Sequence, residues 1–129
     1  PIYLTGRPYM LGPASRAWLE ARGMCPGVVR TTTRVEASLP SESEVGAFKE
    51  AELRALRDAG LELRVAYGNA TTDICAYARA GITPDKTFIV GPHGGLACTS
   101  LDGAAPTVGL GDAYTGHLPS LPTLVKRAP

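Results

Sequence analysis

Short apolar segments alternate along this chain with segments of helical apolar spacing, and this alternation limits the possible folds more than any other feature. Through residue 90 the order is strand, helix, strand, helix, strand, helix, strand. Such an order predicts an α/β domain with a mostly parallel sheet and helices on both faces. The predicted strands are residues 2–4, 28–31, 61–67 and 86–90, and the predicted helices are residues 14–22, 41–59 and 74–80.

Residue types at the helix ends support these bounds. Ser41 is followed three positions later by Glu44, which is the pattern of an N-terminal capping box. Glycine follows each predicted helix, at positions 23, 60 and 81, where helices commonly stop. From residue 96 onward the pattern is lost. We therefore expect residues 1–129 to form one domain, of which residues 96–129 are an irregular tail with one short helix.

Length and charge exclude several classes of protein. A chain of 129 residues is one domain at most, and a hydrophobic share of 44% is enough for a packed core. The 13 basic and 12 acidic residues leave a net charge of +1, which gives no case for general nucleic-acid binding. No apolar run approaches the length that spans a bilayer, and no signal peptide is visible.

The three cysteines, Cys25, Cys75 and Cys98, are far apart in the sequence, odd in number and without a Cys-x-x-Cys pair. This arrangement suggests neither a zinc site nor a disulfide framework. We therefore expect a reducing, cytoplasmic setting. Cys75 is then expected to be a small buried hydrophobic residue on its helix.

Three polar or glycine-rich stretches follow predicted strands, namely Thr5-Gly6-Arg7, Gly68 to Asp73 and Gly91 to Gly95. The carboxyl ends of parallel strands share one edge of a sheet, and ligands of open α/β folds bind there. Thr5 offers a hydroxyl, and Arg7 offers a fork of donors suited to a phosphate. Lys49, on the predicted helix 41–59, would add a second positive charge.

Asn69 and Asp73 supply the oxygen ligands that a hard divalent cation prefers. Both could instead be turn and helix-cap residues, because Asn and Asp are favoured at such positions. Lys49 could be a solvated helix residue, and Arg7 a surface charge. We assign no nucleophile, because no Asp of the chain lies at a strand end in a setting such as Asp-x-Asp.

Two aromatic side chains have a plain structural interpretation beside a functional one. His93 lies in a glycine-rich loop without a nearby carboxylate, so we expect it to be exposed and not a general base. Trp18 is expected to fill the core under its helix. If Trp18 is exposed, it could instead meet a membrane surface.

Several motifs together resemble known families. Tyr3-Leu4-Thr5-Gly6-Arg7-Pro8 resembles the second motif of haloacid-dehalogenase-type phosphohydrolases, Lys49 falls at their third motif, and residues 68–73 resemble their fourth, metal-binding loop. Most of the chain resembles the C-terminal domain shared by lipins and the Nir/retinal-degeneration-B phosphatidylinositol transfer proteins. The further segments that carry this resemblance are Ala17-Trp18-Leu19, Pro26-Gly27-Val28-Val29, Asp73–Tyr77, Phe88-Ile89-Val90-Gly91 and Asp112–Leu118.

The resemblance implies a haloacid-dehalogenase-like, Rossmann-like fold that is incomplete at the N-terminus. Its first strand, with a catalytic aspartate pair, would precede Pro1, so the chain would be a fragment. The implied ligand is phosphatidate. The implied phosphate-binding residues are Thr5, Gly6, Arg7 and Lys49, and the implied ligands of Mg²⁺ are Asn69 and Asp73.

Three functions stay open at this point. The first is recognition of phosphatidate with magnesium-dependent phosphatase activity, as in lipins, if an upstream motif carries Asp-x-Asp. The second is a non-catalytic phosphatidate-binding module of a lipid-transfer protein, which is the kind of module that the Nir branch resembles. The third is a soluble small-molecule phosphatase of the same fold. The protein would be cytoplasmic, peripheral to a membrane in the first two cases, and without a nucleic-acid partner.

Overall fold

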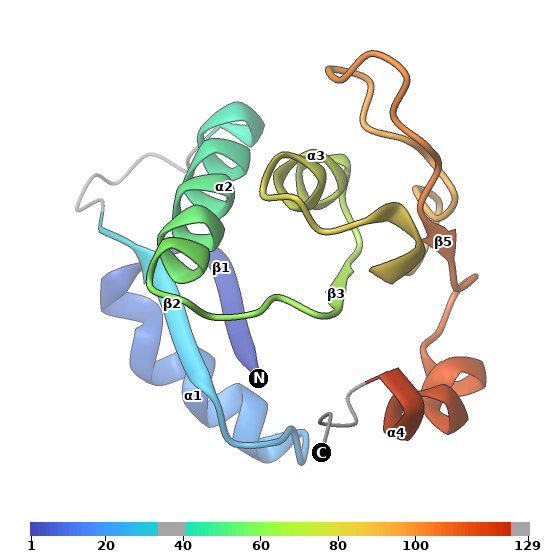
Figure 1. Cartoon of the computed structure of the whole chain (residues 1–129). Coiled ribbons are helices and arrows are strands. Elements are labelled where there is room, and N and C mark those ends of the chain that lie inside the picture. Colours follow the sequence, from blue (N-terminus) through green and yellow to red (C-terminus); the bar gives the residue numbers. More distant parts are fainter. Residues whose placement is uncertain (34–40, 125–129) are drawn as a thin grey trace. The chain divides into compact units, whose positions relative to one another are not determined.

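The computed structural model describes residues 1–33 and 41–124 and confirms the α/β fold class (Figure 1). Its short parallel strands form two sheets, one of two strands and one of three. The chain divides into two compact units, Pro1–Lys49 and Glu50–Pro129, which are taken separately below. The strands were expected to share one sheet. In the described residues β1 pairs with β2, whereas β3, β4 and β5 pair with one another.

The first unit begins with strand β1, Ile2–Pro8, which is followed by the 3₁₀ turn η1, Tyr9–Leu11, and helix α1, Gly12–Ala21. Strand β2, Val28–Thr32, runs parallel to β1, and α1 packs against β2. The predicted helix over residues 14–22 is therefore confirmed with slightly earlier bounds. Gly23 follows α1 at a φ of +65°, a left-handed conformation that favours glycine.

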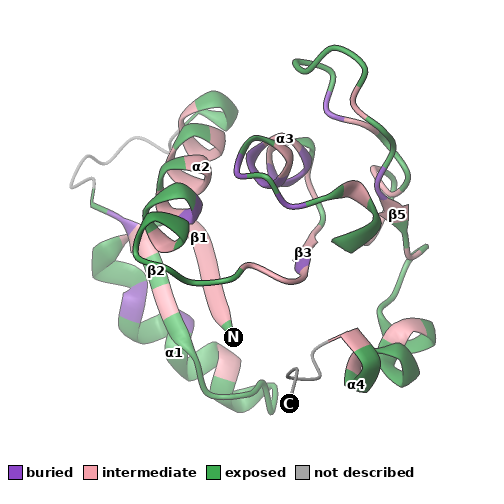
Figure 2. Ribbon diagram, in the orientation of Figure 1, coloured by how far each residue is buried: buried purple, intermediate pink, exposed green. Residues whose placement is uncertain are grey.

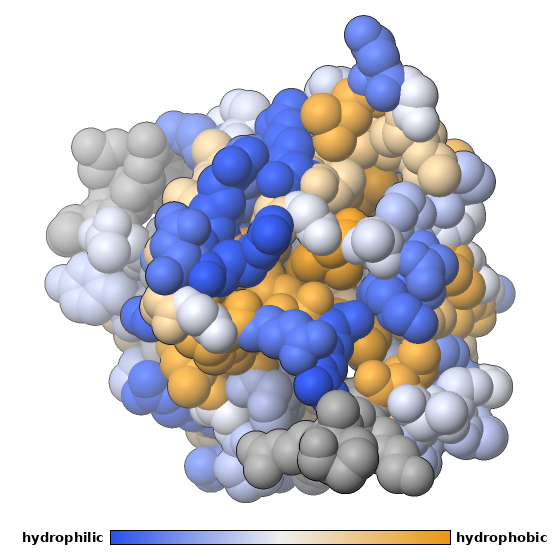
Figure 3. Space-filling model, viewed as in Figure 1, coloured by the Kyte–Doolittle hydropathy of each residue, from blue (hydrophilic) through white to orange (hydrophobic). Residues whose placement is uncertain are grey.

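Helix α2, Glu42–Asp58, starts at the predicted capping box. The Ser41 backbone N–H donates to Glu44 Oε2 at 2.8 Å, and the Glu44 backbone N–H donates to Ser41 Oγ at 3.4 Å. These two bonds satisfy amides that the first turn of a helix leaves without partners. Figure 3 shows hydrophilic residues over much of the outer side of α2. The expected loop at residues 34–40 lies outside the described residues.

The second unit holds strands β3, Ala66–Gly68, β4, Thr87–Ile89, and β5, Val108–Gly109, which pair in the order β3-β4-β5. Helix α3, Thr71–Arg79, follows β3, and the 3₁₀ turn η2, Pro84–Lys86, precedes β4. All pairs are parallel. Figure 2 shows buried residues along α3 and on β3. The buried apolar side chains of this unit are Leu53, Ala66, Ile74, Ala76, Tyr77, Ala80, Ile82, Phe88, Ile89 and Cys98.

The strand predicted over residues 61–67 is wrong in its first part, because β3 begins only at Ala66. Its partner β4 supplies three paired positions, Thr87 to Ile89, which oppose Ala66, Tyr67 and Gly68. A strand needs a paired neighbour, so residues 61–65 remain outside the sheet despite their alternating pattern. Glu62 and Arg64 instead form an ion pair at 2.8 Å.

The segment after residue 96 contributes to the second unit through its aromatic side chains. Beyond β5, it forms the 3₁₀ helix η3, Thr115–Ser120, and the short helix α4, Leu121–Leu124. The His117 ring lies 4.2 Å from the Phe88 ring, and His117 Nε2 is 3.0 Å from the Tyr67 hydroxyl. His117 therefore packs against the central residues of β3 and β4, Tyr67 and Phe88.

Cys75 and Cys98 form a disulfide, so the expectation of no disulfide is wrong. Their Cα atoms are 4.8 Å apart although the residues are separated by 23 positions in the sequence. Sequence distance did not reveal the pair because the fold brings the loop after β4 back to α3. Cys25 is a free, exposed thiol. The cytoplasmic setting, which we inferred partly from the cysteines, stays a prediction.

The described helices do not include one long and apolar enough to cross a membrane.

Candidate functional site

Strand β1 contains a bulge at Thr5, Gly6 and Arg7. Leu4 pairs with Arg30 and Pro8 pairs with Thr32, so these three residues oppose a single residue of β2. The Arg7 backbone N–H donates to Thr5 Oγ1 at 3.3 Å, which stabilises the local turn. The sequence predicted that the strand ends at Leu4 and a loop follows. The strand instead continues through Pro8, and the bulge turns this segment out of the regular ladder.

Gly6 lies tight against helix α2. A Cβ atom at position 6 would be 2.9 Å from Val45 Cγ2, so a larger residue could fit only if Val45 moved. Lys49 lies four residues after Val45, one helical turn along the same row of α2. The first unit thus holds the predicted phosphate-binding residues on two elements in contact, the β1 bulge and the row of α2 that begins at Val45.

The other predicted site residues lie in the second unit, where the β3–α3 loop is organised by Asp73. Only 3% of Asp73 is exposed, and its Oδ2 atom accepts the backbone N–H of Asn69 at 3.0 Å and of Ala70 at 3.1 Å. A Cβ atom on Gly68 would come within 2.6 Å of Asp73 Cβ. Asp73 therefore caps the N-terminus of α3 and closes the loop over Gly68.

The charge of Asp73 affects the pKa values of two tyrosines near the loop. Burial, and then the Asp73 charge, raises the pKa of the Tyr77 phenol far above its ordinary value. Burial and the same charge also raise the pKa of Tyr114. Both phenols are therefore neutral at ordinary pH and act as donors. Tyr77 donates to the Tyr67 carbonyl at 2.7 Å, and Tyr114 donates to the Gly68 carbonyl at 3.3 Å.

The donors of the β3–α3 loop do not by themselves fit a divalent cation. Mg²⁺ takes six oxygen ligands in a near-octahedral arrangement. Asn69 is exposed, but the Asp73 carboxylate is buried and bonded to two loop amides. Among residues 1–33 and 41–124, no group of three or more His, Cys, Asp or Glu could hold a metal ion. The loop supplies at most part of such a site.

The third predicted loop, Gly91 to Gly95, packs on β5 through its backbone. The Gly91 N–H donates to the Gly111 carbonyl at 2.7 Å, and a Cβ atom at Gly94 would be 2.9 Å from Gly109 Cα. His93 is half-buried instead of exposed. The close backbone approach explains Gly94, and φ values of +84° and +83° explain Gly91 and Gly95, so the glycines of this loop need no ligand.

The comparison with protein families decides where this chain belongs. The family model described as PITM 1-3, LNS2 domain, matches residues 1–91, which include both the β1 bulge and the β3–α3 loop. The chain belongs to the LNS2 domain family. Among curated proteins, none matches it. The match confirms the Nir side of the resemblance, and it ends before the Asp112–Leu118 motif.

The structure of this LNS2 domain adds residues that the sequence did not single out. Tyr67, Tyr77 and Tyr114 hold the base of the β3–α3 loop through the hydrogen bonds given above. The one sequence signal for these residues was that Tyr114 lies, with His117, within the Asp112–Leu118 motif. Tyr67 and Tyr77 carried none, because aromatic residues in a strand and a helix ordinarily predict core packing.

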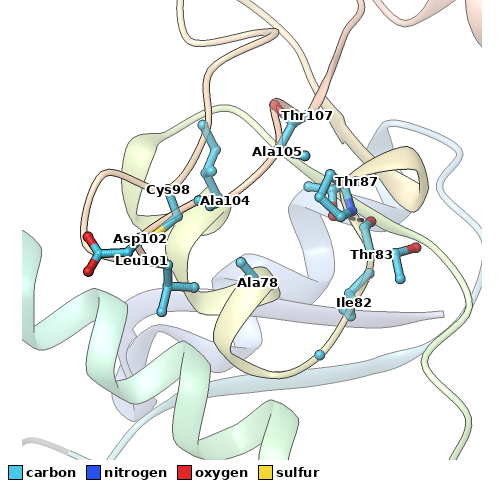
Figure 4. Close-up of a pocket in the computed structure, with 14 residues that line it drawn as sticks. Ala78, Ile82, Thr83, Thr87, Cys98, Leu101, Asp102, Ala104, Ala105 and Thr107 are labelled. Carbon is cyan, nitrogen blue, oxygen red and sulfur yellow. Dashed lines mark hydrogen bonds between the residues drawn. The ribbon is translucent and has the colours of Figure 1, made fainter.

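A cavity of about 490 Å³ lies in the second unit of the LNS2 domain, between α3, η2 and the loop that contains Cys98 and Leu101 (Figure 4). Its wall is mostly apolar. Two of its threonine hydroxyls donate to backbone carbonyls, from Thr87 to Thr83 and from Thr107 to Leu96. None of the predicted phosphate-binding or metal-binding residues lines this cavity. This cavity therefore does not contribute to the predicted phosphate or metal site.

Proposed function

We propose that this LNS2 domain binds a phosphomonoester headgroup and that phosphatidate is its lipid ligand. The β1 bulge carries this proposal, because it displays Thr5, Gly6 and Arg7 beside α2 within the segment that matches the LNS2 family. The resemblance of its motifs to lipins and to haloacid-dehalogenase-type phosphohydrolases supports the choice of a phosphate ligand.

The chemistry of the bulge suits a phosphate group. Arg7 is exposed, and its guanidinium can form two parallel hydrogen bonds to phosphate oxygens. Thr5 Oγ1 accepts the Arg7 N–H, so the hydroxyl proton of Thr5 can donate to a phosphate oxygen. Lys49 would add positive charge from α2. A dianionic headgroup would thus meet charge and directed donors on one side.

Binding without hydrolysis is the function that the residues of this chain support best. A phosphatase would need an aspartate nucleophile, and we assign that role to no residue of the chain. It would also need Mg²⁺, which the resemblance implies. Asn69 would be the loop ligand in that case, with Asp73 fixing the loop. A peripheral, cytoplasmic place at a membrane that contains phosphatidate completes the proposal.

Flotation of the whole chain with lipid vesicles tests this function. Vesicles of phosphatidylcholine with phosphatidate should carry the protein upward, and phosphatidylcholine alone should not. Arg7→Ala should weaken binding about tenfold or more, because a charge-assisted hydrogen bond contributes about 1.5–3 kcal/mol. Arg54→Ala is the matched control, since Arg54 is an exposed arginine paired with Glu50 on α2.

Two results would contradict the proposal in different ways. If wild type and Arg7→Ala bound phosphatidate vesicles equally well, the β1 bulge would not be the headgroup site. Release of inorganic phosphate from phosphatidate in the presence of Mg²⁺ would show an enzyme instead of a binding module. Release from a soluble phosphomonoester without vesicle binding would favour a small-molecule phosphatase.

A further inference from the structure

Helix α1 exposes its largest apolar side chain, and its buried residues are a glycine and a serine. Gly12 and Ser15 are the buried residues of the helix, and Leu19 is half-buried. The Ser15 Oγ atom is buried and has no hydrogen-bond partner in the described part of the chain. Trp18, by contrast, is 53% exposed, so the expectation that it fills the core is wrong. Figure 2 shows most of α1 as exposed.

The exposed apolar residues continue from α1 into the preceding turn η1. Tyr9 and Met10 are 53% and 55% exposed, and Leu11 is 43% exposed. Met10 lies in the 3₁₀ turn η1, which leads directly into α1, the helix that carries Trp18. We call this the η1–α1 surface, and its members are Tyr9, Met10, Leu11, Ala14, Ala17, Trp18 and Ala21.

The charges around the η1–α1 surface are mainly positive. Residues 1–33 contain four arginines and a single acidic residue, Glu20, although the whole chain is nearly neutral. Arg7, Arg16 and Arg22 are all exposed. The Arg22 guanidinium carbon lies 5.4 Å from the centre of the Trp18 ring, so one basic group sits directly beside the largest apolar side chain.

We propose that the η1–α1 surface docks on a lipid bilayer that contains anionic headgroups. Tyr9, Met10, Leu11 and Trp18 would enter the interfacial region, where Tyr and Trp are enriched because their rings are amphipathic. The arginines would meet the negative surface potential of the leaflet. This proposal rests on the proposed function, because Arg7 of the bulge lies two residues before η1. Docking of η1 would bring the bulge to the depth of the lipid headgroups.

A bilayer fits this surface better than a protein partner does. The surface combines aromatic and methionine side chains with a basic rim, which is the composition of helices that lie in a membrane interface. A second copy of the chain would bring the same arginines against one another, and like charges would oppose that association.

Trp18 provides a direct readout, because it is the single tryptophan of the chain. The whole chain is mixed with vesicles of phosphatidylcholine alone, with phosphatidylserine, or with phosphatidate. Docking predicts a blue shift of Trp18 emission on both anionic vesicles and none on phosphatidylcholine. It also predicts quenching by brominated acyl chains and weaker binding at high salt.

A double variant tests the apolar contribution. Tyr9→Ser with Met10→Ser should weaken binding to phosphatidylserine vesicles about tenfold or more, since it removes two large apolar groups from the interface. Both residues are more than half exposed, so the variant should still fold. Leu96→Ser with Leu118→Ser is the matched control, because these leucines are 47% and 53% exposed in the other unit.

The outcomes separate this inference from the proposed function. Binding to phosphatidate vesicles with unchanged Trp18 emission would overturn the docking surface and leave the headgroup site standing. Trp18 quenching that is equal on phosphatidylserine and phosphatidate and unaffected by Arg7→Ala would support docking and overturn headgroup recognition. Dimerisation in sedimentation experiments that the Tyr9/Met10 double variant abolishes, without vesicle quenching, would overturn docking in favour of a second copy.

Discussion

At the scale of single residues, the β3–α3 loop depends on the contact between Gly68 and Asp73. The Asp73 side chain occupies the space that any Cβ atom at position 68 would need, and it ties down the two amides that follow. The sequence indicated that Asn69 and Asp73 matter. It could not indicate that Asp73 is buried and used as a cap. An Asp at such a position can be either a helix cap or a metal ligand, and the residue type is the same in both cases.

Gly68→Ala should therefore destabilise the protein. The new methyl group would overlap Asp73, and relief of that overlap should cost about 1–3 kcal/mol of the free energy of unfolding. Urea denaturation followed by circular dichroism measures this loss. Gly116→Ala is the control, because a Cβ atom there meets nothing within 4 Å. If both variants unfolded at the wild-type midpoint, the loop would not be packed as described.

At the scale of elements, local patterns predicted the helices well and the strand registers poorly. The Ser41–Glu44 capping box and the glycines after the helices are local signals, and α1, α2 and α3 lie close to the predicted bounds. The β1 bulge and the late start of β3 depend on the partner strand. The alternation of apolar and polar residues within one strand cannot reveal how many of its residues will pair with the neighbouring strand.

The disulfide between α3 and the loop that contains Cys98 is also an element-scale feature that spacing could not predict. Because it closes a loop of 23 residues, its removal should cost about 3 kcal/mol of unfolding free energy. Chemical denaturation with and without a phosphine reductant measures this loss, and Cys98→Ser should reproduce it. Cys25→Ser should leave the midpoint unchanged, since Cys25 is a free, exposed thiol. An unchanged midpoint on reduction would contradict a stabilising disulfide.

At the scale of the whole molecule, charge and exposed apolar area are unevenly distributed along the sequence. The composition gave a net charge of +1 for the whole chain, a nearly even balance of basic and acidic residues. Overall composition could not show that four arginines and the exposed Tyr9, Met10 and Trp18 all fall within residues 1–33. The family match, which covers residues 1–91, includes this same segment.

The central claim is that the β1 bulge binds a phosphomonoester headgroup. The most direct test is a titration of the isotopically labelled 129-residue chain with a soluble short-chain phosphatidate, followed through backbone amide NMR shifts. We predict saturable shifts at Thr5, Gly6 and Arg7, with a smaller shift at Lys49, and their loss in Arg7→Ala. Shifts confined to the wall of the cavity around Leu101 and Thr107, with none at the bulge, would contradict the claim.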